Sequence, residues 1–191
     1  MAAQQAAEAT TTLSPPSGIW DVDTRHSSLE FVARHILTKV RGRFEDFSGT
    51  ITIADDPHQS SAQATIRTAS VKTFDDQRDG HLRSPDFFGV DEWPEISFRS
   101  TAIGTVGDNR YRVTGDLTVR DVTRSIDLDA EFVGWSVDHY GNDRATFTAS
   151  TRVKREDFGL TWNLALEAGG WLVGKDVDLE LEIAAVRRAE S

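Results

Sequence analysis

The sequence has no cysteine among its 191 residues. This absence excludes disulfide bonds, thiolate metal sites and a cysteine nucleophile. Basic residues are also scarce, because 21 Lys and Arg stand against 31 Asp and Glu, which gives a formal net charge of -10. A negative charge of this size disfavours nucleic acid and anionic membrane surfaces as partners of the protein as a whole.

Long hydrophobic runs are missing too, since no uninterrupted stretch approaches the ~20 apolar residues of a membrane helix. We therefore expect no stable membrane insertion. Residues 1–17 are mostly Ala, Gln, Thr, Ser and Pro, contain no Lys or Arg, and lack the apolar core of a secretory signal. The sequence predicts a flexible N-terminal tail over residues 1–17, a single domain over residues 18–191, and a cytoplasmic location.

An alternation of period two dominates the rest of the chain. In residues 176–183 every odd residue is apolar and every even residue is acidic, as in a strand with one face in a core and one in water. Similar alternation predicts roughly eight to ten strands. The predicted inward sets include Leu29, Phe31 and Ala33; Phe47, Ile51 and Ile53; Ala62, Ala64 and Ile66; Ile96 and Phe98; Tyr111 to Val119; Ile126 to Phe132; and Phe147 to Val153.

Short polar turns separate these strands at 55–57, 107–109, 120–123 and 140–143, and short turns imply antiparallel neighbours. Such strands bury their apolar faces either in two stacked sheets or in one closed barrel. The many small inward residues, Ala64 and Ala130 among them, favour a barrel that leaves space inside.

Two segments break the alternation. Residues 75–93 begin as a helical turn and continue as an irregular apolar loop. Residues 158–174 contain several Leu and Trp but only one charge before Gly174, Glu167, which is too apolar for an ordinary solvated loop. We expect this second segment to pack against another part of the protein.

Several composite motifs occur in a fixed order along the chain. They include Trp20-Asp21-Val22-Asp23, Gly42-Arg43-Phe44, Arg78-Asp79-Gly80-His81-Leu82, Ser84-Pro85-Asp86-Phe87-Phe88, Gly115 to Thr123, and Arg155-Glu156-Asp157-Phe158-Gly159-Leu160. With these motifs the sequence resembles the YceI-like family of lipocalin-like polyisoprenoid-binding proteins, from Gly18 to about Ala185.

The resemblance implies an all-β fold: a single eight-stranded antiparallel barrel with an elongated apolar cavity and a short helical or irregular insertion. It also implies non-catalytic binding, storage or transport of a long-chain isoprenoid lipid, either a polyprenyl pyrophosphate or an isoprenoid quinone. No cofactor and no metal are implied.

An isoprenoid site needs an apolar tube and polar groups at one end for the head group. The predicted ligand-binding residues are Phe31, His35, Phe47, Arg78, His81, Phe87, Phe88, Phe98, Leu117, Phe132, Phe147, Trp162 and Trp171, and Val113, Leu128 and Leu181 are further wall candidates. For the head group, arginines near the irregular segments are considered, namely Arg34, Arg41, Arg78 and Arg83.

Each of these residues also has a simpler interpretation. The apolar ones are common in any packed core, and the arginines are common surface charges. His35 is either a hydrogen-bonded core residue or a ligand contact, and His81 could instead fix its loop by bonding a carboxylate or a carbonyl. Phe87, Phe88 and residues 160–173 are either lids over the cavity or a homodimer contact.

Three other functions stay open at this stage. A carboxylate-rich loop with Asp75, Asp76, Asp79, His81 and Asp86 is the best metal candidate. A barrel isomerase or cyclase would use His35 or an inward carboxylate as its proton handler. The third alternative is an interaction or stress-related module with a filled barrel.

Overall fold

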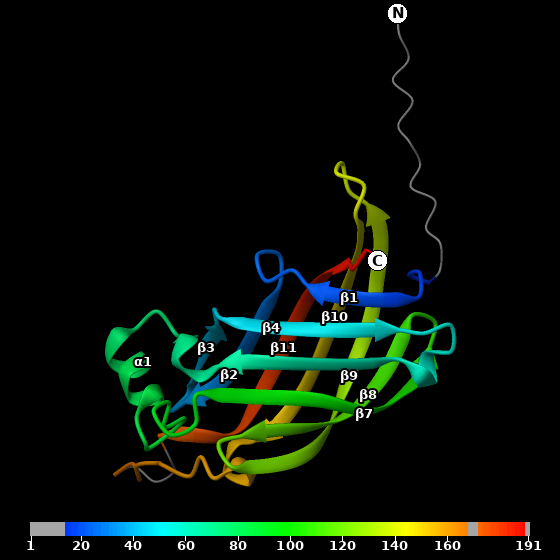
Figure 1. Ribbon diagram of the computed structural model, residues 1–191. Coiled ribbons are helices and arrows are strands. Elements are labelled where there is room, and N and C mark those ends of the chain that lie inside the picture. The colour runs from blue at the N-terminus through cyan, green and yellow to red at the C-terminus, as the bar shows by residue number, and fades with distance from the viewer. Residues whose placement is uncertain (1–13, 168–171, 190–191) are drawn as a thin grey trace, which may run out of the picture.

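The computed structural model describes residues 14–167 and 172–189, and within them eleven strands form one antiparallel sheet (Figure 1). The expected tail lies mostly outside the described residues. The strands are β1 Gly18–Val22, β2 Ser28–His35, β3 Thr38–Phe44, β4 Phe47–Ile53, β5 Ser61–Arg67, β6 Val71–Lys72, β7 Glu95–Gly107, β8 Arg110–Val119, β9 Val122–Val137, β10 Asp143–Lys154 and β11 Val173–Arg187. The helical elements are η1 Pro57–Gln59, η2 Thr68–Ser70, α1 Asp76–Arg83 and η3 Arg155–Phe158.

The short first strand closes the barrel. Trp20 of β1 lies opposite Ile51 of β4 on one side and opposite Arg187 of β11 on the other. Among the described residues this produces a closed ring of eight strands, in the order β1, β4, β5, β7, β8, β9, β10 and β11. The predicted eight-stranded barrel is therefore confirmed. β2, β3 and β6 continue the sheet from the first part of β11.

The two ends of the barrel differ. At one end, here called the β1 end, β1 begins, β11 ends, and the β9–β10 hairpin projects beyond the barrel (Figure 1). The opposite end, here called the α1 end, carries α1, η3 and the turn between β2 and β3. Among the described residues, no helix is both long and apolar enough to cross a membrane.

Each end has its own apolar core cluster. At the β1 end, Trp20 and Ala185 are fully buried and pack with Ala145 and Phe132. At the α1 end, the buried residues are Ile96, Leu117, Val119, Phe158 and Leu160. Phe44 and Phe88 pack against this second cluster from outside the ring of strands.

The insertion between β6 and β7 contains the expected helical turn. The Asp75 carboxylate caps α1 by accepting a hydrogen bond from the Arg78 backbone N at 2.9 Å. Asp79, which is 1% exposed, accepts hydrogen bonds from the Thr73 backbone N at 2.7 Å and from Thr73 Oγ1 at 2.5 Å. Lys72 Nζ lies 3.3 Å from the other Asp79 oxygen. The helix is therefore anchored by one buried, charge-compensated carboxylate.

Candidate functional site

The barrel encloses a cavity of about 410 Å³. This volume lies within the range of about 300–1,000 Å³ that is typical of small-molecule sites. Its wall is formed mainly by apolar side chains of the closed ring together with Leu29 of β2. The wall residues are Val22, Leu29, Ile51, Ile53, Ala62, Ala64, Ile66, Phe98, Ile103, Tyr111, Val113, Leu117, Ile126, Leu128, Ala130, Phe132, Phe147, Ala149, Leu179, Leu181 and Ile183.

Small side chains create the space. Ala130 of β9 and Ala149 of β10 lie directly opposite each other, and both line the cavity. On the other side, Ala64 of β5 pairs with Phe98 of β7. Protein interiors are normally filled by closely packed side chains. Alanines at these inward positions are too small to fill the space, and the neighbouring aromatic rings do not occupy it.

Polar groups gather where the cavity meets the β1 end. Ser14, Ser17, Asp55 and Ser60 contribute to the lining there, together with Pro57. We call these residues the rim. The α1 end is closed instead by the cluster around Leu117 and Phe158, so the polar opening lies opposite the irregular segments where arginines were expected to meet a head group.

Hydrogen bonds fix the segment before β1 across the rim. Arg187 Nη2 donates to the Ser17 carbonyl oxygen at 2.6 Å, and Trp20 Nε1 donates to the Pro16 carbonyl oxygen at 3.2 Å. The Ser17 hydroxyl also donates to the Asp55 carboxylate. The chain entering β1 is thus part of the cavity entrance.

The structure places four of the predicted site residues on the cavity wall: Phe98, Leu117, Phe132 and Phe147. Val113, Leu128 and Leu181 lie there as well. Trp171 lies outside the described residues. The remaining predicted residues do not line the cavity, and they are Phe31, His35, Phe47, Arg78, His81, Phe87, Phe88 and Trp162.

These remaining residues have other surroundings. The ring centroid of Phe44 lies 5.8 Å from that of Phe31 and 5.6 Å from that of Phe88, so the three rings form a row beside the ring of strands. Phe47 is buried opposite Ile66 on β5. His35 ends β2 at the hairpin turn.

A compact aromatic group covers the α1 end. The His81 ring centroid lies 4.4 Å from that of Trp162 and 5.0 Å from that of Phe87. His81 Nε2 is 2.9 Å from a carboxylate oxygen of Asp86. This contact is the loop-fixing role that the sequence left open for His81.

Three of the four candidate arginines are also engaged. Arg78 Nε donates to Thr73 Oγ1 at 2.8 Å, and Arg83 Nε donates to the Ala69 carbonyl oxygen at 2.8 Å. Arg41 lies between the carboxylates of Glu30 and Glu180. Their donors are therefore directed at the protein itself rather than into the cavity.

Arg155 was not singled out from the sequence. It is 5% exposed, and its guanidinium donates to four backbone carbonyl oxygens. The acceptors are Gly174 at 2.8 Å, Trp162 at 2.9 Å, Val173 at 3.3 Å, and Leu160. Burial lowers the pKa of this guanidinium. The only signal in the sequence was its place in the motif that opens the apolar segment 158–174.

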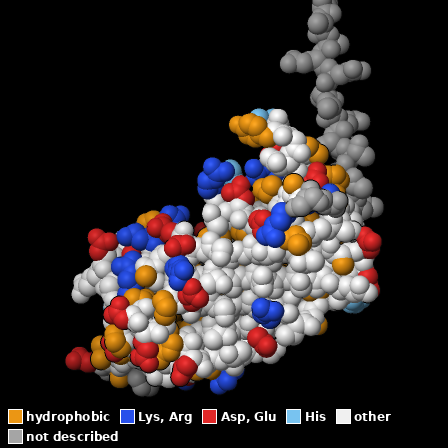
Figure 2. Space-filling model, viewed as in Figure 1, with side chains coloured by type: hydrophobic (Ala, Val, Ile, Leu, Met, Phe, Trp, Pro, Cys, Tyr) orange, Lys and Arg blue, Asp and Glu red, His pale blue; other side chains and the backbone are white. Residues whose placement is uncertain are grey.

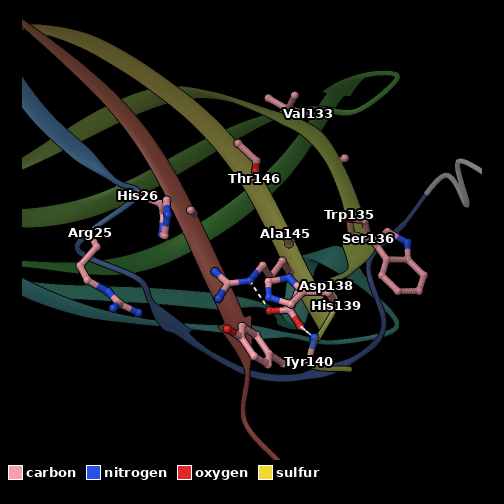
Figure 3. Close-up of a pocket in the computed structure, with 13 residues that line it drawn as sticks. Arg25, His26, Val133, Trp135, Ser136, Asp138, His139, Tyr140, Ala145 and Thr146 are labelled. Atoms are coloured by element: carbon pink, nitrogen blue, oxygen red, sulfur yellow. Dashed lines mark hydrogen bonds and ion pairs between the residues drawn. The ribbon is translucent and has the colours of Figure 1, made fainter. Parts of the chain in front are cut away.

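A second, open pocket of about 810 Å³ lies on the outer face of β9 and β10, beside the loop between β1 and β2 (Figure 3). Its centre is an ion-pair network in which Arg144 Nη1 lies 2.8 Å from Asp23 and Arg144 Nε lies 2.6 Å from Asp138. His26 Nδ1 is 2.8 Å from Asp23. The hydrogen bond from Arg144 is the main cause that lowers the pKa of Asp23 to about 2, and Arg144 likewise lowers the pKa of Asp138.

This network predicts acid sensitivity. Because folding lowers the pKa of Asp23 from 3.8 to about 2, its ionised form stabilises the fold above pH 3.8, and this contribution disappears as the pH falls toward 2. We expect the wild-type free energy of unfolding to fall across this window and the slope to flatten in Asp23→Asn. Urea unfolding at a series of pH values measures both. An unchanged slope in the variant would contradict the assignment.

Few groups near the cavity suit proton transfer or metal binding. Among the described lining residues the titratable side chains are Asp55 at the rim and Tyr111 on the wall. His35, the proton handler considered from the sequence, lies away from the cavity. Over residues 14–167 and 172–189, no three His, Asp or Glu side chains converge as a metal site would require.

Comparisons with known proteins agree with this geometry. A YceI-like domain matches residues 20–185. A UPF0312 protein of Staphylococcus aureus (strain bovine RF122 / ET3-1) is 38% identical over 163 residues, which are 83% of this chain and 91% of that protein. The crystal structure of BcnA from Burkholderia cenocepacia superposes with a TM-score of 0.75 at 24% identity, over 85% of this chain and 98% of that one.

A further solved structure is a polyisoprenoid binding domain from Saccharophagus degradans implicated in plant cell wall breakdown. It has a TM-score of 0.69 at 19% identity, over 91% of this chain and 100% of that one. At such identity the likeness concerns the fold. The domain match over residues 20–185 confirms the resemblance read from the motifs, and the chain belongs to the YceI-like family.

Proposed function

We propose that this protein binds an isoprenoid lipid with its tail in the barrel cavity and releases it chemically unchanged, as a store or carrier. The observation that carries the proposal is a closed barrel whose cavity wall has apolar side chains from every strand of the ring and is predominantly apolar, with a group of polar residues at the rim. The Saccharophagus degradans domain, which shares the fold, is a polyisoprenoid-binding domain. Both points favour a binding protein over an enzyme.

The wall explains the preference for a hydrocarbon tail. Phe98, Leu117, Phe132 and Phe147 contribute aromatic and aliphatic surface from four different strands. Each Å² of apolar tail surface removed from water contributes about 25 cal/mol, so the tail supplies most of the affinity. This favours lipids with branched or unsaturated chains that follow an irregular apolar wall.

The rim favours an uncharged head group. The described lining residues include no Lys or Arg, and they include the carboxylate of Asp55. A pyrophosphate would meet that negative charge, whereas a quinone carbonyl requires only a hydrogen-bond donor. Ser60 Oγ accepts a hydrogen bond from the Ala54 backbone N at 3.0 Å, which leaves its O–H to donate to such a carbonyl.

The direct test is organic extraction of the purified protein followed by mass spectrometry, with native mass spectrometry for stoichiometry. The proposal predicts one intact isoprenoid, with a quinone head more often than a pyrophosphate. Recovery of a chemically altered lipid after incubation would support a barrel isomerase or cyclase instead.

A thermal shift experiment separates binding from the interaction module. A ligand at 100 times its Kd stabilises the folded state by about 2.7 kcal/mol, which raises the melting temperature by several degrees. We expect this shift with an isoprenoid quinone and a smaller one with a polyprenyl pyrophosphate. An empty protein with no shift for either lipid would contradict the proposal.

A further inference from the structure

The turn between β2 and β3 exposes two apolar residues at the α1 end. Ile36 and Leu37 form this turn between the opposed residues His35 and Thr38. Ile36 is 45% exposed and Leu37 is 85% exposed. Tight hairpin turns ordinarily consist of Gly, Asn or Asp, so two aliphatic residues at the tip are unusual for a turn that faces only water.

The backbone of this turn is strained. Ile36 has a φ of 56°, a left-handed conformation that a β-branched residue rarely adopts. The conformation is maintained by the neighbouring chain, because the Ile36 backbone N donates to the Leu172 carbonyl oxygen at 2.8 Å. Strain of this kind concentrates at sites with a function.

A neighbouring apolar residue extends the exposed surface. The Leu172 backbone N donates to the Leu164 carbonyl oxygen at 2.9 Å, which places the chain around Leu164 beside the turn. Leu164 is itself 56% exposed. Ile36, Leu37 and Leu164 are here called the tip patch. Figure 2 shows hydrophobic side chains gathered at this end of the molecule, among charged ones.

Two cationic residues follow the tip patch along the β2–β3 hairpin. Arg34 and Lys39 lie directly opposite each other on β2 and β3, and both are exposed. Like charges in this position destabilise a sheet. Farther from the tip, Arg41 is paired with Glu30 and Glu180. Arg34 and Lys39 form no ion pair with the described residues. The Asp178 carboxylate accepts a hydrogen bond from Arg152, and Lys39 has only a longer-range electrostatic effect on it.

We propose that the tip patch docks this protein on the surface of an anionic lipid bilayer. Leu37 and Ile36 would enter the boundary between head groups and acyl chains, while Arg34 and Lys39 would meet the anionic head groups. The net charge of -10 does not prevent this contact, because salt screens charges more than about 8 Å away under physiological conditions.

The charges favour a membrane over a second copy of the chain. In a symmetric dimer the same patch meets itself, so Arg34 and Lys39 of one copy would face the same two cations of the other. Nothing in the described part of the tip patch would compensate them. An anionic bilayer supplies the missing negative charge and an apolar layer together.

The test is co-sedimentation of the full chain with phosphatidylcholine vesicles, with and without phosphatidylglycerol. We expect binding to the anionic vesicles, abolished in Leu37→Asp and weakened about fivefold by each of Arg34→Gln and Lys39→Gln. Val137→Asp is the matched control, since Val137 is 59% exposed on β9 at the β1 end. It should bind as the wild type does.

Ile36→Gly adds a readout that a purely structural role would not produce. Glycine relieves the strain at a φ of 56°, so the melting temperature should rise by a few degrees while vesicle binding falls. A structural role predicts the first change without the second.

Three outcomes would overturn the proposal. One is wild-type protein that remains in the supernatant with both kinds of vesicle. Another is equal binding by Leu37→Asp and Val137→Asp. The third is a dimer in sedimentation velocity that Leu37→Asp alone dissociates, because the patch would then be a contact between copies.

Membrane docking is independent of the cavity, because Ile36 and Leu37 do not line it. Lipid loading should therefore stay unchanged in these variants, and measuring it distinguishes a failure of the docking proposal from a failure of the proposed function.

Discussion

Replacing Arg155 with alanine should lower the free energy of unfolding by about 3 kcal/mol or more, because buried polar groups left without partners are destabilising by about 1–3 kcal/mol each. Arg155 links the carbonyl oxygens of Leu160, Trp162, Val173 and Gly174, and it thereby joins both sides of the apolar segment to η3. For a chain of this length we expect the melting temperature to fall by roughly 10 °C. Urea unfolding and circular dichroism measure these changes.

Two further variants separate the hydrogen bonds of Arg155 from its charge. Arg155→Lys keeps the charge but lacks the planar set of donors, so it should lose much of the same stability. Arg152→Ala removes an exposed arginine that pairs with Asp178, and its effect should be far smaller. If Arg155→Ala and Arg152→Ala were equally mild, the buried arginine would not be what secures the α1 end.

Filling the cavity should strongly weaken lipid binding without unfolding the protein. Ala130 and Ala149 face each other across β9 and β10 on the cavity wall, and phenylalanine at both positions would occupy the space of the tail. We expect affinity for an isoprenoid quinone to fall at least tenfold, which corresponds to about 1.4 kcal/mol. Native mass spectrometry and thermal shift with the same lipid measure this loss.

The neighbouring position provides the control. Ser150 follows Ala149 on β10, points to the opposite face and is exposed. Ser150→Phe adds the same ring outside the barrel and should leave lipid loading unchanged. Equal loading of the Ala130→Phe, Ala149→Phe double variant and of the wild type would place the lipid elsewhere.

Local patterns predicted the strands well. The alternation of Leu179, Leu181 and Ile183 with acidic residues predicted a strand with one wet face, and these three apolar residues line the cavity on β11. The small residues Ala64, Ala130 and Ala149 indicated space inside a barrel, and they border it. Such signals are local because successive side chains on a strand face opposite sides.

The same patterns located only part of the cavity wall. Phe31 and Phe47 have the inward phase, yet neither borders the cavity, because Phe31 lies in a row of rings with Phe44 and Phe47 is buried at the start of β4. His81 and Arg78 have side chains that can bind a polar head group, but they form hydrogen bonds within their own loop instead. The period-two alternation along a strand indicates which face of the sheet a residue lies on, but it does not indicate which other segment packs against that residue.

The sequence by itself determined most strands, the turn positions and the acidic surface, since each depends on residue type and spacing along a single segment. The order of its motifs along the chain identified the family. Only the tertiary structure decided that β1 closes the ring with β11, that the rim lies opposite the aromatic group at the α1 end, and that Arg155 bonds carbonyl oxygens on both sides of the apolar segment. These features depend on which segments far apart in the chain meet. That choice arises from the packing of the whole barrel, which local periodicity does not encode.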